Sequence, residues 1–257
     1  MNTNKTKARL KAGQSVTGCF MRHPDPGLAE VVGLMGWDFL LFDGEHSPLS
    51  ARECEHLARV CELIGVTSLV RVPSHVPWMI AQVLDAGIEG VQIPMIESGE
   101  QARAIARAAK YSPVGTRGLA TTRAAKFGQR IPFNIAEHVA SSNAETLVIA
   151  QIETPAGIEH LPSILQAPEI DVIFIGPNDL SLSLGVPGEM QHPKVQQAFD
   201  TIISAVTATD KALGVLVPNV EAALEWQRKG VRYVVVVMEA ILGPAVRDFL
   251  KQVRNPQ

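Results

Sequence analysis

The segment TLVIAQIETPAGIEHLPSILQAPEIDVIFIGPNDLS, residues 146–181, indicates the fold class most clearly. Two short runs rich in β-branched residues, Thr146–Ile152 and Val172–Ile175, flank a segment that opens with the turn residues Thr154–Gly157 and reads as a helix to about Leu165. Strands that are apolar on both faces are typical of a parallel sheet buried beneath helices. The segment therefore predicts a strand–helix–strand unit of an α/β protein.

The same alternation of short apolar runs and longer amphipathic runs continues along the chain. The predicted strands are Val16–Met21, Phe39–Asp43, Thr67–Val72, Gly90–Pro94, Thr146–Ile152, Val172–Ile175, Gly214–Val217 and Tyr233–Val237. The predicted helices are Pro26–Gly36, Ser50–Ile64, Val76–Ala86, Ser98–Ala109, Asn134–Ser141, Thr154–Leu165, Pro193–Ala212, Asn219–Lys229 and Glu239–Val253. Eight such units predict a closed (β/α)8 TIM barrel, an α/β fold. An open doubly wound sheet would need a glycine-rich turn after the first strand, and residues 21–26 do not form one.

Length and composition agree with one domain and exclude some partners. The chain has 257 residues, of which 46% are hydrophobic and 19% charged, so we expect a single barrel domain over residues 1–257. Residues 1–14 are expected to be an N-terminal lead-in. The net charge is −3 and the sequence has no basic run that would bind a nucleic acid backbone. We therefore expect no nucleic-acid partner.

The termini and the cysteines indicate a cytoplasmic protein. The first residues have no apolar core of a secretory signal, and no apolar run reaches the roughly 18 residues that a membrane span requires. We therefore expect no membrane partner. The three cysteines, Cys19, Cys54 and Cys61, lack metal-ligand spacing. They are expected to be buried thiols in a reducing compartment rather than a disulfide or redox pair.

Ionisable residues gather at one end of the predicted strands. In a (β/α)8 barrel the working groups lie at the C-terminal strand ends. The residues that fall there are Asp43, Glu45, His46, Arg71, Glu97, Glu153 and Asp179. Few predicted strands carry an ionisable residue at the N-terminal end. This asymmetry predicts a functional site at the C-terminal rim of the barrel.

Two acidic residues at this rim are candidate metal ligands. Glu153 and Asp179 follow neighbouring strands, so their carboxylates can converge. Two hard anionic oxygens, completed by waters, suit Mg²⁺ or Mn²⁺. The alternative is that each carboxylate caps the N-terminus of a helix. Gln151 shares the side of the strand with Glu153 and is a candidate to support a ligand or a substrate oxygen.

Arg71 and His46 are the candidate anion-binding and proton-transfer residues. Arg71 ends an apolar strand, where its guanidinium could hold a carboxylate at two points or form a structural salt bridge with Asp43 or Glu45. His46 is the one histidine at a predicted strand end. Its ordinary pKa suits proton transfer at neutral pH, with Asp43 or Glu45 orienting the ring. The alternative is a purely structural histidine.

The segment Tyr111–Arg130 interrupts the alternation. It is rich in Gly, Thr and Arg, and contains the cations Arg117, Arg123 and Lys126. Such a loop could bind an anionic substrate tail, for which Arg123 is a candidate, or close over the site. An exposed polar loop is the alternative.

Four motifs, taken together, resemble a known family. They are Phe-Asp43-Gly-Glu45-His46, Val-Arg71-Val-Pro73, Gln151-Ile-Glu153-Thr-Pro-Ala-Gly157 and Gly176-Pro-Asn-Asp179-Leu-Ser181. In this order and spacing they resemble the HpcH/HpaI aldolase family of class II, metal-dependent pyruvate aldolases. That family includes 4-hydroxy-2-oxo-heptanedioate aldolase and 2-dehydro-3-deoxyglucarate aldolase. The resemblance covers nearly the whole chain and implies a TIM barrel of the phosphoenolpyruvate/pyruvate type.

The resemblance also implies roles for the candidate residues. Glu153 and Asp179 would bind a divalent cation, Mg²⁺, Mn²⁺ or Co²⁺, to which the 2-oxo acid is chelated. Arg71 would contact the keto oxygen and stabilise the enolate. His46, paired with Asp43, would transfer protons.

The same resemblance implies further substrate contacts and an assembly. Gln151, Gly176, Pro177 and Asn178 would line the substrate site. Asp85 would reach the site of a neighbouring subunit in a homo-trimer or homo-hexamer, in which the last helix packs on a neighbour.

Two regions depart from the family pattern, namely Cys19-Phe20-Met21, where a Trp is common, and the loop Gly118–Gly128. Both are expected on the acceptor side of the pocket, so the aldehyde partner stays open.

The sequence thus predicts a metal-dependent aldolase. It would cleave or form a 4-hydroxy-2-oxo acid, to or from pyruvate and an aldehyde, through a metal-stabilised enolate. No lysine lies at a predicted strand end, which disfavours a Schiff-base mechanism. Two alternatives remain: an oxaloacetate or other 2-oxo acid decarboxylase that uses the same site, and a non-catalytic protein that binds a 2-oxo acid.

Overall fold

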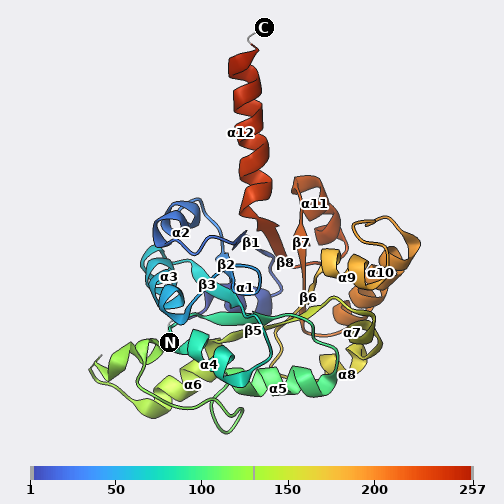
Figure 1. Ribbon diagram of the computed structural model, residues 1–257. Coiled ribbons are helices and arrows are strands. Elements are labelled where there is room, and N and C mark those ends of the chain that lie inside the picture. Colours follow the sequence, from blue (N-terminus) through green and yellow to red (C-terminus); the bar gives the residue numbers. More distant parts are fainter. Residues whose placement is uncertain (1–2, 130, 256–257) are drawn as a thin grey trace.

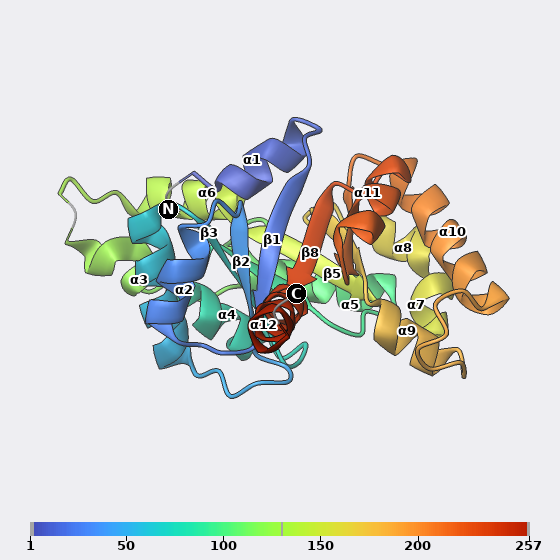
Figure 2. The ribbon, with the colours of Figure 1, turned by 90° about the horizontal axis from the view of Figure 1, so that it is seen from above.

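The computed structural model describes residues 3–129 and 131–255 and contains a closed eight-stranded parallel barrel. Each strand pairs with the next, and the last strand pairs with the first (Figures 1 and 2). The strands are β1 Val16–Met21, β2 Phe39–Asp43, β3 Thr67–Arg71, β4 Gly90–Ile93, β5 Leu147–Ile152, β6 Val172–Ile175, β7 Ala212–Val217 and β8 Tyr233–Val237. The predicted (β/α)8 TIM barrel is confirmed.

Helices surround the barrel in the order expected of alternating units (Figure 1). They are α1 Lys5–Lys11, α2 Pro26–Gly33, α3 Ala51–Ile64, α4 Pro77–Asp85, α5 Gly99–Ala109, α6 Ile135–Glu145, α7 Pro155–Glu159, α8 Leu161–Leu165, α9 Pro177–Ser183, α10 Pro193–Thr207, α11 Val220–Arg228 and α12 Met238–Arg254, with a 3₁₀ segment η1 at Arg123–Gly128. Hydrogen bonds from capping side chains fix the first residues of several helices. Ser50 and Glu53 form a reciprocal capping box on α3, and the Ser98 hydroxyl accepts a hydrogen bond from the Gln101 N–H at the start of α5.

The core has two layers, one inside the barrel and one between the barrel and its helices. Inside, the rings of Phe39 and Tyr233 stack with centroids 4.4 Å apart. Gly18 lies against this pair, and a Cβ there would be 2.0 Å from the Phe39 ring. Glycine at position 18 therefore lets the aromatic layer fill the N-terminal half of the barrel, which leaves the C-terminal half for polar side chains.

Three elements differ in kind from the sequence prediction, and helix α10 ends at Thr207 rather than at about Ala212, where β7 begins. The lead-in contains a helix, α1, which is tied to the barrel because the Lys7 ammonium donates to the Thr146 carbonyl at 2.8 Å and pairs with Asp171 at 2.9 Å. The single helix predicted after β5 is two short helices that meet at His160. The polar turn predicted at residues 176–179 is the start of helix α9, because Pro177 occupies its first turn, where a missing N–H costs nothing.

The last helix, α12, projects away from the barrel (Figures 1 and 2). None of its residues is buried, and it exposes the large apolar side chains of Ile241, Leu242, Val246, Phe249 and Val253. Among the described helices, none combines the length and the apolar character needed to cross a membrane.

The three cysteines are buried free thiols, as predicted. Burial raises the pKa of each to about 12, so they are unreactive at neutral pH.

Candidate active site

A cavity of about 340 Å³ opens at the C-terminal end of the barrel, and all eight strands or the residues directly after them contribute to its wall. Its polar lining includes Asp43, His46, Arg71, Gln151 and residues 176–179. These positions were predicted from four separate motifs spread over more than 130 residues of sequence. The barrel thus brings most of the predicted site residues to one cavity.

Arg71 is held by two carboxylates. Its Nε and Nη2 donate to Oδ1 and Oδ2 of Asp43, both at 2.9 Å, and its Nη1 lies 3.0 Å from Oε2 of Glu45. Burial opposes the charge on Asp43, but the hydrogen bond and charge of Arg71 outweigh it and lower the Asp43 pKa. The Arg71 guanidinium also lies 4.8 Å from the centroid of the Phe20 ring. The salt bridge that was one alternative for Arg71 is therefore present, and it fixes the guanidinium at the cavity wall.

The imidazole of His46 is not paired with Asp43. The Asp43 carboxylate accepts the His46 backbone N–H at 3.3 Å, whereas the ring Nε2 lies 3.9 Å from Oε2 of Glu45. The Asp43 oxygens accept from Arg71 and from two backbone N–H groups, and no contact between Asp43 and the imidazole ring is found in the described residues. The expected pairing with Asp43 is wrong in this structure, and Glu45 is the acid closest to the ring. The His46 side chain is 61% exposed at the rim.

Glu153 is a buried carboxylate at the end of β5. It accepts the Met95 N–H at 2.8 Å and a hydrogen bond from the Gln151 amide, whose oxygen accepts from Gln92. Burial, with smaller contributions from the charges of Asp179 and Glu45, raises the Glu153 pKa to about 7 against those hydrogen bonds. Met95 has φ 54°, a conformation that costs energy in a non-glycine residue. The strained residue Met95 is thus the one whose backbone N–H holds the Glu153 carboxylate.

Neither Glu153 nor Asp179 is a helix N-cap. The hydroxyl of Thr154, not Glu153, caps α7 by accepting the Gly157 N–H at 3.1 Å. Gly176 is the N-cap of α9, and Asp179 lies in the first turn of that helix without a capping bond. The helix-cap alternative for these two carboxylates is therefore wrong.

The donor set around Glu153 fits a divalent cation. A buried carboxylate next to a second carboxylate is disfavoured in its charged form, and a cation between them would reverse that cost. Gly176 allows close approach, since a Cβ there would lie 2.3 Å from Oε2 of Glu153. Within residues 3–129 and 131–255, no group of three or more His, Cys, Asp or Glu side chains is arranged to hold a metal. The protein would thus supply two carboxylates and leave the other positions to water and substrate oxygens.

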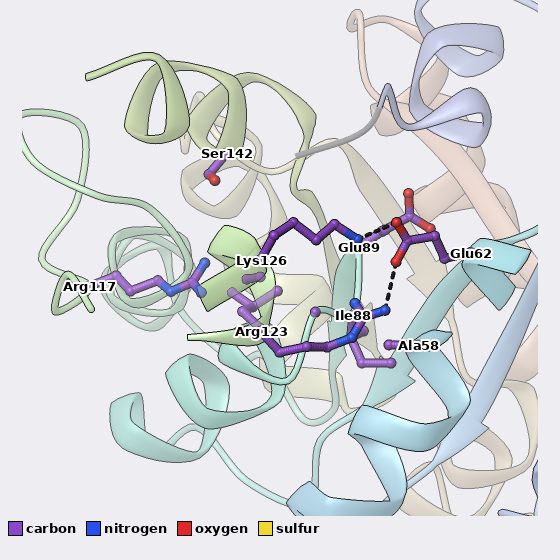
Figure 3. Close-up of a pocket in the computed structure, with 11 residues that line it drawn as sticks. Ala58, Glu62, Ile88, Glu89, Arg117, Arg123, Lys126 and Ser142 are labelled. Atoms are coloured by element: carbon purple, nitrogen blue, oxygen red, sulfur yellow. Dashed lines mark hydrogen bonds and ion pairs between the residues drawn. The ribbon is translucent and has the colours of Figure 1, made fainter. Parts of the chain in front are cut away.

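Three predicted residues do not line the cavity. Glu153 lies behind the cavity wall, against Gln151 and Gly176, whereas Asp85 and Arg123 lie away from the cavity. Asp85 ends α4 and pairs with Arg117, Nη2 to Oδ1, at 2.5 Å. Arg123 pairs with Glu62 at 2.6 Å, in a separate cavity of about 40 Å³ beside the N-terminal end of β4 (Figure 3). Figure 3 also shows Lys126 reaching the same carboxylate. The expected place of the loop Gly118–Gly128 on the acceptor side of the pocket is wrong for this chain, because the loop packs on α3 and α4 at the opposite end of the barrel from the cavity. A role for Asp85 in a neighbouring subunit's site stays a prediction.

The polar cavity residues Gln92 and Arg22 were not predicted from the sequence, and Phe20, from the segment that was expected beside the pocket, lines the cavity. Phe20 packs on Arg71, Gln92 bonds to Gln151, and Arg22 follows β1 at the cavity rim. Gln92 pairs in register with Arg71 on the neighbouring strand, and it is 1% exposed. Gln92 could have been found from the sequence, because it is the single polar side chain in the apolar run Gly90–Ile93.

Comparisons with known proteins identify relatives of this chain. Residues 16–240 match the sequence model of the family HpcH/HpaI aldolase/citrate lyase. A hydroxypyruvate/pyruvate aldolase from Roseobacter denitrificans is 35% identical over 92% of this chain and 91% of its own. A 2-keto-3-deoxy-L-rhamnonate aldolase from Shigella sonnei is 33% identical over 93% and 89%. The crystal structure of an HpcH/HpaI aldolase/citrate lyase family protein from Burkholderia cenocepacia superimposes with a TM-score of 0.92, at 31% identity over 98% of this chain and 100% of that one.

Proposed function

The chain belongs to the HpcH/HpaI aldolase/citrate lyase family and is a carbon–carbon lyase of the aldolase type, and from this premise we propose that it is a divalent-metal-dependent pyruvate aldolase. Its substrate would be a 4-hydroxy-2-oxo acid, which is cleaved to, or formed from, a pyruvate-type 2-oxo acid and an aldehyde. The observation that supports the proposal most is the buried carboxylate of Glu153 beside Asp179, next to a cavity that holds Arg71.

The metal is the first part of the proposal. Glu153 and Asp179 would hold Mg²⁺, Mn²⁺ or Co²⁺, and the Gln151 amide and the Met95 N–H would keep Glu153 in position. When bound, the cation would supply the positive charge that draws electrons toward the 2-oxo group of the substrate.

The chain's own residues would bind and orient the 2-oxo acid. Arg71 presents a fixed positive charge at the cavity wall because Asp43 and Glu45 hold the opposite side of its guanidinium. Residues Gly176, Pro177 and Asn178 line the cavity opposite and would contact the substrate carboxylate. A charge that is held in place before the reaction stabilises the developing enolate oxygen without further reorganisation.

Proton transfer is assigned to His46. In cleavage, the C4 hydroxyl proton leaves as the C3–C4 bond breaks and its electron pair moves to C3. His46 at the rim, with Glu45 near its ring, would accept that proton and deliver a proton to C3 of the enolate, which completes the methyl group of pyruvate. In the reverse direction His46 would remove a C3 proton and return one to the C4 oxygen.

The assembly is the last part of the proposal. The large apolar side chains of α12 are not covered by the described residues of the chain, and a cavity of about 630 Å³ lies between α10, α11 and β7. We propose a homo-trimer or homo-hexamer in which α12 packs on a neighbouring subunit.

The test is an aldol screen with pyruvate, a panel of aldehydes and added Mg²⁺, Mn²⁺ or Co²⁺. We expect metal-dependent turnover that is lost in EDTA and in the variants Glu153→Gln and Asp179→Asn. The variant Glu30→Gln, which removes an exposed carboxylate on α2, should leave turnover unchanged. Turnover that survives exhaustive chelation would contradict the metal site. Oxaloacetate is assayed alongside, and decarboxylation without any aldol product would favour the decarboxylase.

A further inference from the structure

Arg22 is a cation at the mouth of the cavity that the proposed reaction leaves unused. It follows β1, its side chain is 47% exposed, and it lines both the active-site cavity and the adjoining larger cavity beside α10 and α11. Both Arg71 and Arg22 therefore border the same space, from different sides. Asp43 and Glu45 hold the Arg71 guanidinium at three nitrogen atoms, whereas Arg22 is not held in this way.

The one ion-pair partner of Arg22 in the described part of the chain is Glu239, in the first turn of α12. The distance from Nε of Arg22 to Oε1 of Glu239 is 3.4 Å, longer than a good charge-assisted hydrogen bond. The same oxygen also lies 3.4 Å from Nε2 of His23. Glu239 thus positions Arg22 loosely, and the other N–H groups of the guanidinium remain available to a ligand.

The wall between the pyruvate end and Arg22 is apolar. Phe20, Leu216 and Val237 line this part of the cavity, and the last two also line the adjoining cavity. An acceptor aldehyde that enters on this side would lay a short carbon chain along these side chains and place its far end near Arg22. A planar guanidinium binds carboxylate or phosphate oxygens at two points.

We propose that Arg22 selects acceptor aldehydes that carry an anionic group, a carboxylate or a phosphate, at the end away from the carbonyl. This inference rests on the proposed aldolase function, since it names the class of aldehyde that the reaction uses. Glu239 competes with the substrate anion for the same guanidinium. Removal of the Glu239 charge therefore strengthens the preference, while removal of the Arg22 charge abolishes it.

The experiment compares matched aldehydes in the aldol reaction with pyruvate. 4-Oxobutanoate and butanal differ in a terminal carboxylate, and glyceraldehyde 3-phosphate and glyceraldehyde differ in a phosphate. The readout is the ratio of kcat/KM for the anionic aldehyde to that for its neutral counterpart. We expect Arg22→Met to reduce this ratio by about tenfold or more, in line with the loss of a charged hydrogen bond. The variant Arg22→Lys should recover part of it, and the pair that responds identifies the anion.

The variant Glu239→Gln distinguishes selection from anchoring of α12. If Arg22 only holds α12 through Glu239, then Arg22→Met and Glu239→Gln change both aldehydes of a pair equally and in the same direction, which overturns the proposal. If Arg22 binds the substrate anion, Glu239→Gln raises the ratio and Arg22→Met lowers it. Arg59→Met, on the exposed face of α3, is the control for loss of a surface cation and leaves the ratio unchanged.

A binding measurement separates failure of this inference from failure of the proposed function. Wild-type protein that turns over neither aldehyde of either pair contradicts the aldolase function. In that case saturation-transfer NMR of 4-oxobutanoate and butanal with the metal-loaded protein still tests Arg22. Tighter binding of the carboxylate that is lost in Arg22→Met supports the inference, and equal binding of the two compounds overturns it.

Discussion

Arg71 and Asp43 form a two-point salt bridge between adjacent strands, with Nε–Oδ1 and Nη2–Oδ2 distances of 2.9 Å. The two residues are also register partners in the pairing of β2 with β3. Strand pairing therefore sets the distance between the charged groups before any ligand binds. In such a buried pair, removal of one partner leaves the other uncompensated.

The first prediction concerns this pair. Asp43→Asn keeps the shape of the side chain but removes the charge that holds Arg71. We expect a loss of about 1–3 kcal/mol in the free energy of unfolding, measured by chemical denaturation, and a fall in kcat of at least about tenfold. Glu55→Gln, which breaks the i,i+4 pair with Arg59 on α3, is the matched control and should cost under about 0.5 kcal/mol. Equal costs for the two variants would show that the Asp43 pair has no special role.

The second prediction uses the close approach of Gly176 to Glu153. A Cβ at position 176 would lie 2.3 Å from Oε2 of Glu153 and 3.1 Å from Nε2 of Gln151. Because Oε2 is the end of a side chain, the carboxylate can move aside, and we expect Gly176→Ala to fold. Displacement of a ligand should weaken binding of Mn²⁺ by about tenfold or more, measured by calorimetry. Gly118→Ala is the control, because a Cβ at position 118 would meet no atom within 4 Å. Gly185→Ala is unsuitable because Gly185 has φ 78°, which strains any other residue. Unchanged Mn²⁺ affinity in Gly176→Ala would argue against Glu153 as a ligand.

The third prediction separates binding from proton transfer at His46. Since the ring is exposed and makes no close hydrogen bond to Asp43, His46→Ala should fold normally and keep its affinity for pyruvate. Exchange of the pyruvate methyl protons with D2O, followed by NMR, should slow by about 100-fold or more. His56→Ala, on the exposed face of α3, should exchange at the wild-type rate. Wild-type exchange in His46→Ala would remove this residue from the mechanism.

Much of the barrel could be predicted because strand formation here depends on local composition. The predicted bounds of β1, β2, β6 and β8 coincide with those in the structure. Helix α1 was missed because its stability is not local: Lys7 reaches Thr146 and Asp171, which are more than 130 residues away in the sequence. The spacing of apolar residues within positions 1–14 cannot predict these long-range contacts.

The site residues could be predicted as a set, but their partners could not. Acidic and basic residues at strand ends signalled the rim, and the barrel brings most of them together. Whether Asp43 faces Arg71 or His46 depends on side-chain geometry, and strand register favours Arg71. Arg123 was attributed to substrate binding because of its charge alone. Its salt bridge to Glu62 depends on how the loop folds back over α3, which the sequence pattern does not determine.

The fourth prediction tests the assembly. Phe249 is 66% exposed on α12, so in a free subunit its replacement should be harmless. If α12 packs on a neighbour, Phe249→Asp places a charge in an apolar interface and should shift the protein to smaller species, measured by light scattering coupled to size exclusion. Asp248→Asn, the adjacent position on the same helix, should retain the wild-type mass. A wild-type chain that is already monomeric would contradict the proposed trimer or hexamer.

The fifth prediction concerns pH and the buried carboxyl of Glu89, which precedes β4 and accepts the Ser68 N–H at 3.0 Å. Burial, with a smaller contribution from the charge of Glu62, raises the Glu89 pKa from 4.5 to about 7. The folded state therefore holds this proton more tightly than the unfolded state between pH 4.5 and 7. The stability that this proton provides is fully present below pH 4.5 and is lost as the pH rises through 7.

Glu89→Gln keeps an acceptor for the Ser68 N–H and removes the titration. Relative to wild type, the variant should therefore gain stability between pH 5 and pH 8, by up to about 3 kcal/mol at 1.4 kcal/mol for each pKa unit. The free energy of unfolding is measured at both pH values by chemical denaturation. Other titrating groups are common to both proteins and cancel in the difference. For the control Glu30→Gln, the difference from wild type in the free energy of unfolding should be the same at both pH values. A difference that is also the same at both pH values for Glu89→Gln would mean that folding does not raise the Glu89 pKa.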